Sequence, residues 1–332
     1  MKALPTLAVA TVLLLTPHAT ADYASRPEVQ AYLDDLSARH GFSRQWLSSV
    51  LTGAERKDSI IEAISRPAEK AKPWHEYRGI FVADDRIVAG VDFWREHGGT
   101  VAAAQEQYGV AAEVIVAVIG VETYFGRYLG RYRVIDALST LAFDYPRRAR
   151  FFKGELTEFL LLVREGGHDP FAPMGSYAGA MGYGQFIPSS YRAYAVDFDA
   201  DGVRDIWTNK ADAIGSVANY FARHGWRGQG PAVLRVELEN PALDEVANAG
   251  LELEHTVGAL RDQGVVGIDA LPADSRAALF RMQAVDGDEY WLALHDFYVV
   301  TRYNRSAMYA LAVLQLATEI RRHFDASAVS DG

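Results

Sequence analysis

The sequence VIVAVIGVET, residues Val114–Thr123, is an apolar run that ends on one carboxylate, Glu122. Because the run is apolar on every side, a helix formed by it would be buried all round. Its length and the preceding Ala111-Ala112-Glu113 favour a helix. A strand is the competing interpretation, because valine and isoleucine are strong strand formers. Gly126 is expected to supply the C-terminal cap of the helix.

Glu122 would lie in the last turn of this helix, where two effects favour a protonated carboxyl. The C-terminus is the negative end of the helix dipole, and apolar neighbours penalise the charged form. A glutamate in this position is therefore a candidate general acid. On spacing alone, a surface glutamate that simply follows a core helix is the more common case.

The composition of the 332-residue chain limits its class, because 49% of its residues are hydrophobic, enough for a large core. Its formal net charge of -10 argues against general nucleic-acid binding, which requires a basic surface. It contains no cysteine, so an exported form would have neither a disulfide nor a lipid-carrying cysteine at the cleavage site.

Residues 1–21 have the pattern of a cleaved secretory signal peptide. Lys2 and the mostly apolar stretch 4–15 precede Ala19-Thr20-Ala21, which fits a small-residue cleavage site. The apolar stretch is short for a membrane span, and no later stretch is long and apolar enough. We therefore expect a soluble periplasmic protein whose mature chain starts near Asp22.

The remaining pattern predicts a mainly helical α+β protein. Helical periodicity and capping residues predict helices over residues 28–40, 57–65, 84–97, 100–108, 135–143, 149–164, 210–224 and 306–324. Pro27 is expected in the first turn of the first helix, Gly41 at its end, and Ser43 as the cap of the next helix. The aromatic residues Trp74 and Tyr77 could line a cleft or simply pack on neighbouring helices. Alternating apolar residues predict strands over 233–238, 278–285 and 289–294, with a hairpin turn at Asp286-Gly287 and a short helix over 256–263. The chain would divide into an N-terminal helical region (22–83), a core (84–227), a small β-rich insertion (228–295) and a C-terminal segment (296–324) that completes the core.

A glycine-rich segment, residues 166–184, is a candidate ligand-binding loop, because glycines let the backbone approach a ligand closely. A plain flexible connection is the alternative. A phosphate-binding loop is not expected, because the segment has no Lys-Ser or Lys-Thr ending. One of the serines of Pro188-Ser189-Ser190 is expected to cap the helix that follows.

The sequence DFDADGVRD, residues 197–205, is the strongest local motif. Asp197, Asp199 and Asp201 alternate before Gly202, as the oxygen ligands of an EF-hand-like calcium loop do. Val203 would contribute its carbonyl. Thr208 stands where such loops usually have a glutamate, so we expect Asp212 to supply that ligand. The motif predicts a structural Ca²⁺ site, and the alternative is an acidic turn that caps the next helix.

Four stretches together carry a resemblance to a known family. They are IGVETYFG (119–126), GAMGYGQFIPSSY (179–191), the acidic loop, and FYVVTRYNRS (297–306). In this order they resemble the membrane-bound lytic murein transglycosylase B family, glycoside hydrolase family 103. The likeness extends over about residues 22–324. Some members carry a lipid on an N-terminal cysteine, and this chain differs from them because it has none.

The resemblance implies a lysozyme-like core, a flanking helical domain and a small β domain. It implies cleavage of the β-1,4 bond between N-acetylmuramic acid and N-acetylglucosamine in peptidoglycan, with 1,6-anhydromuramoyl ends as products. Glu122 would be the only catalytic acid/base, and the family's calcium ligands would fall on Asp197, Asp199, Asp201, Val203 and Asp212. The implied substrate-binding residues are Tyr77, Arg147, Arg148, Ser176, Gln185, Phe186, Tyr220, Tyr303, Asn304 and Tyr309.

The implied chemistry agrees with the residues, because an ordinary glycosidase needs two carboxylates and the motifs supply only one. A single carboxyl suffices when the attacking hydroxyl belongs to the substrate, which gives it a high effective molarity. The expected partner is the peptidoglycan glycan strand, with cell-wall synthesis or remodelling proteins as further candidates, and no organic cofactor is expected. The alternatives are a hydrolytic muramidase and a calcium-dependent peptidoglycan-binding protein without turnover.

Overall fold

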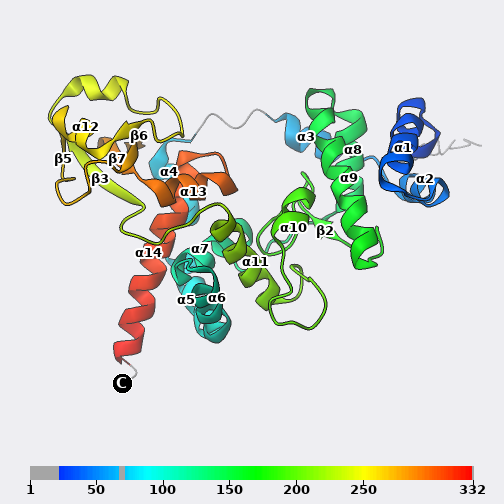
Figure 1. Ribbon diagram of the computed structural model, residues 1–332, viewed down its shortest axis with the longest axis horizontal. Coiled ribbons are helices and arrows are strands. Elements are labelled where there is room, and N and C mark those ends of the chain that lie inside the picture. The colour runs from blue at the N-terminus through cyan, green and yellow to red at the C-terminus, as the bar shows by residue number, and fades with distance from the viewer. Residues whose placement is uncertain (1–21, 67–71, 331–332) are drawn as a thin grey trace, which may run out of the picture. The chain divides into compact units, whose positions relative to one another are not determined.

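The computed structural model describes residues 22–66 and 72–330, so the predicted signal peptide lies outside the described residues (Figure 1). The chain forms two compact units, divided between Arg56 and Lys57. The α-helices are α1 (Pro27–His40), α2 (Arg44–Gly53), α3 (Asp58–Ser65), α4 (Trp74–Phe81), α5 (Asp84–Glu96), α6 (Gly98–Tyr108), α7 (Ala112–Thr123), α8 (Val134–Asp144), α9 (Ala149–Gly166), α10 (Pro188–Tyr194), α11 (Lys210–Arg223), α12 (Val257–Asp262), α13 (His295–Tyr303) and α14 (Ala307–Ser330).

Short 3-10 helices and strands complete the described residues. The 3-10 helices are η1 (Tyr23–Ser25), η2 (Pro146–Arg148) and η3 (Pro241–Glu245). The strands are β1 (Tyr132–Arg133), β2 (Met174–Gly175), β3 (Val233–Leu238), β4 (His255–Thr256), β5 (Val265–Val266), β6 (Arg276–Ala284) and β7 (Gly287–Ala293). The predicted domain boundary at residue 83 differs from the division of the two compact units, and the four predicted regions stay a prediction.

The first unit contains η1, α1 and α2, and its caps follow the sequence. Pro27 occupies the first position of α1, and Gly41 ends that helix with a left-handed φ of 66°. The Ser43 hydroxyl accepts a hydrogen bond from the Trp46 amide at the start of α2. Both predicted helix boundaries are therefore confirmed.

Helix α7 is the centre of the second unit. Every residue from Val114 to Val121 is buried, as expected for a helix that is apolar on all sides. Helices α5, α6, α11 and α14 pack against it, and α14 comes from the far end of the chain (Figure 1). Each buried valine or isoleucine stabilises the fold by about 1.5–3 kcal/mol. The position of α7, and of Glu122 in its last turn, is therefore strongly fixed.

The end of α7 corrects one prediction, because Gly126 does not cap the helix. The left-handed residue is Tyr124, with a φ of 53°, and its amide donates to the Gly120 carbonyl at 3.0 Å. Phe125 is also left-handed, with a φ of 57°. Gly126 follows at a φ of 89°, where a side chain would overlap the Tyr183 ring. The glycine is needed for this close approach, and tertiary packing ends the helix two residues earlier.

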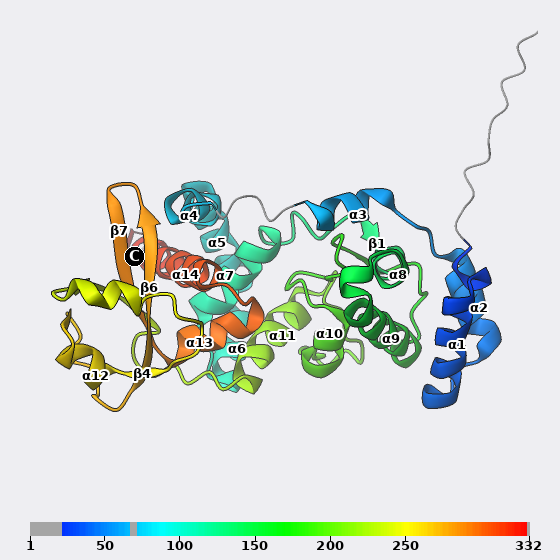
Figure 2. The same cartoon turned by 90° about the horizontal axis from the view of Figure 1, so that it is seen from above.

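The predicted β-rich insertion is a five-stranded antiparallel sheet in the order β4-β6-β7-β3-β5. Figure 2 shows its neighbouring strands β6 and β7 in orange. Strands β6 and β7 form the predicted hairpin around Asp286-Gly287, with Ala284 opposite Gly287. One face of the sheet has its own apolar core, which includes Val236, Leu279 and Leu292. On the other face Phe280 lies 5.5 Å from the Phe297 ring of α13. The sheet is therefore held to the helical part through α13 and α4.

Candidate active site

Glu122 lies in the last turn of α7 and keeps part of its surface exposed. Its Oε1 accepts a hydrogen bond from the Tyr309 hydroxyl of α14 at 2.5 Å. Burial raises the pKa of Glu122 from 4.5 to about 7, and the Tyr309 hydrogen bond acts in the opposite direction. The helix C-terminus also disfavours the charged form. The carboxyl can therefore give or take a proton near neutral pH, as an acid/base catalyst must.

Two further phenol groups share the surroundings of Glu122. Burial, and then the charge of Glu122, raises the pKa of Tyr77 on α4 and holds that of Tyr303 well above 10. The same two causes hold the pKa of Tyr309 well above 10, so its hydroxyl stays a donor. The structure thus brings Tyr77, Tyr303 and Tyr309, three of the predicted substrate-binding residues, together around Glu122. Their role in substrate binding stays a prediction.

The turn after Glu122 is strained and tightly held. Left-handed conformations of non-glycine residues cost about 1–3 kcal/mol each, and here Tyr124 and Phe125 adopt them in succession. The Phe125 ring packs 5.4 Å from the Phe93 ring. Arg86 of α5 lies 4.5 Å above the Tyr124 ring and donates from Nη1 to the Gly120 carbonyl at 2.6 Å. Arg86 lies 34 residues before that carbonyl, and no local sequence signal predicted its role.

Thr123 joins the end of α7 to the glycine-rich segment, a role that the sequence analysis missed. Its buried hydroxyl lies 3.0 Å from the Tyr183 carbonyl and 3.1 Å from the Ile119 carbonyl. The same oxygen accepts from the Gly126 amide at 3.0 Å. In the sequence, only the position of Thr123 directly after Glu122 pointed to this role.

Ser176 lies in the glycine-rich segment and Gln185 directly follows that segment, at the two ends of a compact turn. The Ser176 hydroxyl accepts from the Ala180 amide at 3.1 Å, and the Ser176 amide donates to the Ala180 carbonyl at 2.8 Å. Gln185 is left-handed, with a φ of 49°, and its Nε2 donates to the Gly182 carbonyl at 3.0 Å. These bonds make the segment ordered, so the interpretation as a plain flexible connection is wrong.

The start of α10 corrects a second prediction, because no serine caps it. Ile187 stands at the N-cap position and Pro188 at the first helical position. Glu155 of α9 takes the capping role instead, since its carboxylate accepts from the Ser189 amide at 3.0 Å and from the Ser189 hydroxyl at 2.9 Å. A partner 34 residues away cannot be inferred from local capping rules.

Three of the predicted substrate-binding residues form an aromatic wall, Phe186, Tyr220 and Tyr303. Their rings lie 4.7 to 5.9 Å apart, and Phe186 and Tyr220 are mostly buried. The Tyr220 hydroxyl donates to the Arg302 carbonyl at 2.6 Å, and that of Tyr303 donates to the Gly184 carbonyl. Their phenol groups therefore hold the wall together. Asn304 is exposed at the end of α13.

Arg147 and Arg148 are exposed on η2, between α8 and α9. The Arg148 guanidinium lies 4.3 Å above the Phe151 ring. Within the described residues, no hydrogen bond or ring contact connects either arginine to the group around Glu122. Their predicted role in substrate binding stays a prediction.

The acidic loop brings three of its predicted ligands together. One carboxylate oxygen each of Asp197, Asp199 and Asp212 lies within 4.8 Å of the others. Asp212 is fully buried, and its two oxygens accept from the Phe198 and Asp205 amides at 2.7 Å. Three converging carboxylates repel one another, and a cation between them would remove that repulsion. This all-oxygen donor set fits Ca²⁺.

The other two predicted ligands lie differently. The exposed Asp201 accepts from the Val203 amide at 2.8 Å and is not in the group of three carboxylates. Val203 is also exposed. Asn209, which the sequence analysis did not name, donates to Asp199 at 2.9 Å and caps α11. It therefore ties the loop to the exit helix.

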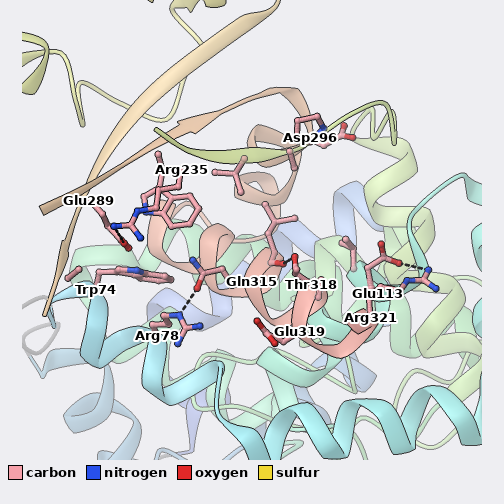
Figure 3. A pocket seen from close by; sticks show the side chains of 18 of the residues that line it. Trp74, Arg78, Glu113, Arg235, Glu289, Asp296, Gln315, Thr318, Glu319 and Arg321 are labelled. Carbon is pink, nitrogen blue, oxygen red and sulfur yellow. Dashed lines mark hydrogen bonds and ion pairs between the residues drawn. The ribbon is translucent and has the colours of Figure 1, made fainter. Parts of the chain in front are cut away.

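A separate cavity of about 1130 Å³ lies between α4, α14 and the β6–β7 hairpin, and Glu122 does not line it (Figure 3). Most of its charged side chains already have partners within the cavity wall. The pairs are Arg321 with Glu113 at 2.9 Å, Arg78 with Gln315 at 2.6 Å and Arg235 with Glu289 at 3.6 Å. We therefore place the candidate active site at Glu122 and not in this cavity.

Within residues 22–66 and 72–330, no helix has the length and apolar character needed to cross a membrane.

The comparisons with known proteins identify the family of this chain. The family model described as "Transglycosylase SLT domain" matches residues 24–318. Membrane-bound lytic murein transglycosylase B of Escherichia coli (strain K12) is 41% identical over 308 residues, which cover 90% of this chain and 84% of that protein.

Two solved structures extend the comparison to the fold. Catenated lytic transglycosylase SltB1 of Pseudomonas aeruginosa is 51% identical with a TM-score of 0.89, covering 91% of this chain and 100% of that one. Escherichia coli lytic transglycosylase Slt35, solved in complex with calcium, is 41% identical with a TM-score of 0.83, covering 91% and 95%. The predicted α+β fold with a lysozyme-like core is confirmed. Because the family model and these relatives span nearly the whole chain, this protein belongs to the transglycosylase SLT family of lytic murein transglycosylases.

Proposed function

We propose that the protein cleaves the β-1,4 bond between N-acetylmuramic acid and N-acetylglucosamine in peptidoglycan, with Glu122 as its only acid/base catalyst. The observation that carries this proposal is the partly exposed Glu122 carboxyl, whose pKa lies near 7. Burial and Tyr309 are the influences on that pKa, and no second carboxylate of the described residues is among them. We therefore assign both halves of the reaction to this single acid.

In the first half, protonated Glu122 donates its proton to the glycosidic oxygen as the bond from that oxygen to C1 of the muramoyl sugar breaks. The N-acetyl group of the substrate, or the cleft, stabilises the positive charge at C1. The Tyr309 hydroxyl, which already donates to Oε1, stabilises the carboxylate that forms.

In the second half, the Glu122 carboxylate takes the proton from the C6 hydroxyl while that oxygen bonds to C1. The product ends in a 1,6-anhydro ring, no water is consumed, and Glu122 is protonated again. The attacking hydroxyl belongs to the sugar whose C1 is attacked, so it acts at a high effective molarity. The reaction therefore needs no second catalytic carboxylate. A raised pKa near 7 suits both transfers, because neither protonation state is then strongly favoured.

The neighbouring side chains would hold the sugar rings. Within the aromatic wall, the partly exposed Tyr303 would offer a ring face to a sugar, and the buried Phe186 and Tyr220 would support it. Tyr77, also partly exposed, lies near Glu122. Ser176 and Gln185 would lie near the muramoyl sugar, with Asn304 at the end of α13. Arg147 and Arg148 would meet lactyl or peptide carboxylates.

The masses of the products released from purified peptidoglycan test this proposal. Lytic cleavage leaves anhydro ends, which are lighter by one water than the reducing ends left by a hydrolytic muramidase. If the products carry reducing ends, the protein is a hydrolytic muramidase and the proposed lytic mechanism is wrong. A binding protein without turnover would give another result. Its wild type would bind glycan without releasing products, and the Glu122→Gln variant would bind glycan equally well.

We also propose that the acidic loop binds a structural Ca²⁺ through Asp197, Asp199 and Asp212, with Asp201 and Val203 completing the set. Support comes from the three converging carboxylates and from the calcium complex of the related Escherichia coli enzyme. The ion would supply no chemistry to the reaction. It would hold the loop between α10 and α11.

For localisation we propose the periplasm, where its peptidoglycan substrate lies. The support is the signal-peptide pattern of residues 1–21 and the murein-cleaving relative. Association with cell-wall synthesis or remodelling proteins stays a prediction.

A further inference from the structure

The segment directly after Glu122 repeats a Gly-Arg-Tyr unit, at residues 126–128 and 130–132. We call residues 124–132 the arginine–tyrosine loop. Arg127 and Arg131 are both exposed on it. The Arg127 guanidinium lies 4.4 Å from the Tyr124 ring centre, and that of Arg131 lies 5.4 Å from the Tyr132 ring centre. Each arginine is therefore held on an aromatic face. Arg131 donates from Nη2 to the Tyr132 hydroxyl at 3.4 Å, and the other N–H donors of the two guanidinium groups make no hydrogen bond within the described residues.

These two cations have no carboxylate partner within the described residues. Many other arginines of the chain do: Arg133, next in sequence, binds Asp136 at 2.7 Å, and Arg192 of α10 binds Glu165 at 2.6 Å. Arg127 and Arg131 thus place two positive charges, without a carboxylate partner among the described residues, on one loop of a chain whose net charge is -10. An anionic ligand would compensate them.

The loop is rigid, because it is anchored on the glycine-rich segment. Strand β1 at its end pairs with β2, and a side chain at Gly130, with a φ of 101°, would overlap the Gly175 carbonyl. The Gln185 Nε2 donates to the Leu129 carbonyl at 3.4 Å. The arginines thus project from a fixed loop that touches Gln185 and borders Ser176, the two residues expected near the muramoyl sugar.

We infer that Arg127 and Arg131 bind carboxylates of the peptide stems carried by the glycan strand, beside the bond that Glu122 cleaves. Planar guanidinium groups bind carboxylates through paired hydrogen bonds, and the exposed Tyr128 adds a ring surface. This inference rests on the proposed function, in which the strand carries anionic stems at regular intervals. It makes the two arginines specificity residues for stem-bearing strands.

The test compares two substrates, intact peptidoglycan and the same glycan after an amidase has removed its stems. The double variant Arg127→Gln/Arg131→Gln should lose about 10-fold in kcat/KM on intact strands and little on stripped strands. Arg127→Lys/Arg131→Lys should recover part of the loss, because it keeps the charge without the planar fork. Arg235→Gln/Arg322→Gln, which removes the same charge from exposed positions on β3 and α14, should change neither rate.

An equal loss on both substrates, or no loss on either, would overturn the inference. The proposed function fails on a different result, namely wild-type products without anhydro ends. The substrate comparison uses variants of the arginine–tyrosine loop, whereas the product masses are measured on the wild type alone. The two failures are therefore distinguishable.

Discussion

At the scale of single residues, Glu122 combines a cost in stability with a use in catalysis. A carboxyl whose pKa rises from 4.5 in the unfolded chain to about 7 in the fold retains a proton that the unfolded chain releases. The free energy of unfolding therefore falls as the pH rises from 4.5 to 7, by at most ~3 kcal/mol, because partial exposure reduces the effect.

Replacement Glu122→Gln removes this titration. Activity should fall at least about 1000-fold, since no other carboxyl takes over the proton transfer. The variant and the wild type should also differ in their free energy of unfolding. Relative to the wild type, the free energy of unfolding of the variant should be about 2 kcal/mol higher at pH 8 than at pH 4. Urea unfolding at both pH values measures this difference, and an equal effect at the two pH values would show that the Glu122 carboxyl is not perturbed in the fold.

Tyr309 sets how far the pKa of Glu122 rises. Its hydrogen bond favours the ionised carboxylate, so Tyr309→Phe should raise that pKa further. The alkaline limb of kcat/KM, where the protonated acid is lost, should move to higher pH by about one unit. Tyr303→Phe is the matched control, because the Tyr303 hydroxyl donates to the Gly184 carbonyl and not to Glu122. Identical pH profiles for the wild type and Tyr309→Phe would refute this role.

At the scale of elements, the glycine-rich segment and the loop after α7 fit together through backbone contacts. Gly130→Ala combines a left-handed φ of 101° with an overlap on the Gly175 backbone. We expect a loss of about 3 kcal/mol or more in the free energy of unfolding, and reduced activity. Gly109→Ala, at a φ of 68° with open space around it, should cost only about 1 kcal/mol. Equal losses for both variants would mean that the contact with Gly175 contributes nothing.

The acidic loop should respond to calcium as an element of the fold. Added Ca²⁺ should raise the thermal midpoint of the wild type, because a ligand that binds only the folded state stabilises it. The rise should disappear with a chelator and in Asp212→Asn, whose buried carboxylate is one of the three that converge. Asp92→Asn, an exposed residue of α5, should keep the rise. No shift in the wild type would remove the calcium proposal.

Elements with strong local signals could be predicted from the sequence, and their ends often could not. The apolar run of α7, the Ser43 cap and the β6–β7 hairpin were predicted and are confirmed. The caps of α7 and α10 were wrong, because Phe125 packing and Glu155 decide them from elsewhere in the chain. Helix α4 was not predicted, although its aromatic residues were noted as candidates to line a cleft.

At the scale of the whole molecule, the site is assembled from segments that are remote in sequence. Glu122 and Tyr309 are 187 residues apart and meet because α14 packs along α7. No periodicity or spacing rule predicts such a contact, and the sequence placed Tyr309 at the site only through the family resemblance. The strain at Tyr124, Phe125 and Gln185 likewise depends on tertiary packing, and it marks the site once the structure is known.

The mass of the sugar ends released from purified peptidoglycan tests the central claim most directly. If Glu122 serves as acid and then as base for the substrate's own hydroxyl, the wild type should release 1,6-anhydromuramoyl ends. The result should be the same when the digestion is run in water labelled with a heavy oxygen isotope, and the ends should not carry the label. Reducing ends that carry the water isotope at C1 would show that solvent attacks instead, and would contradict the single-carboxylate mechanism.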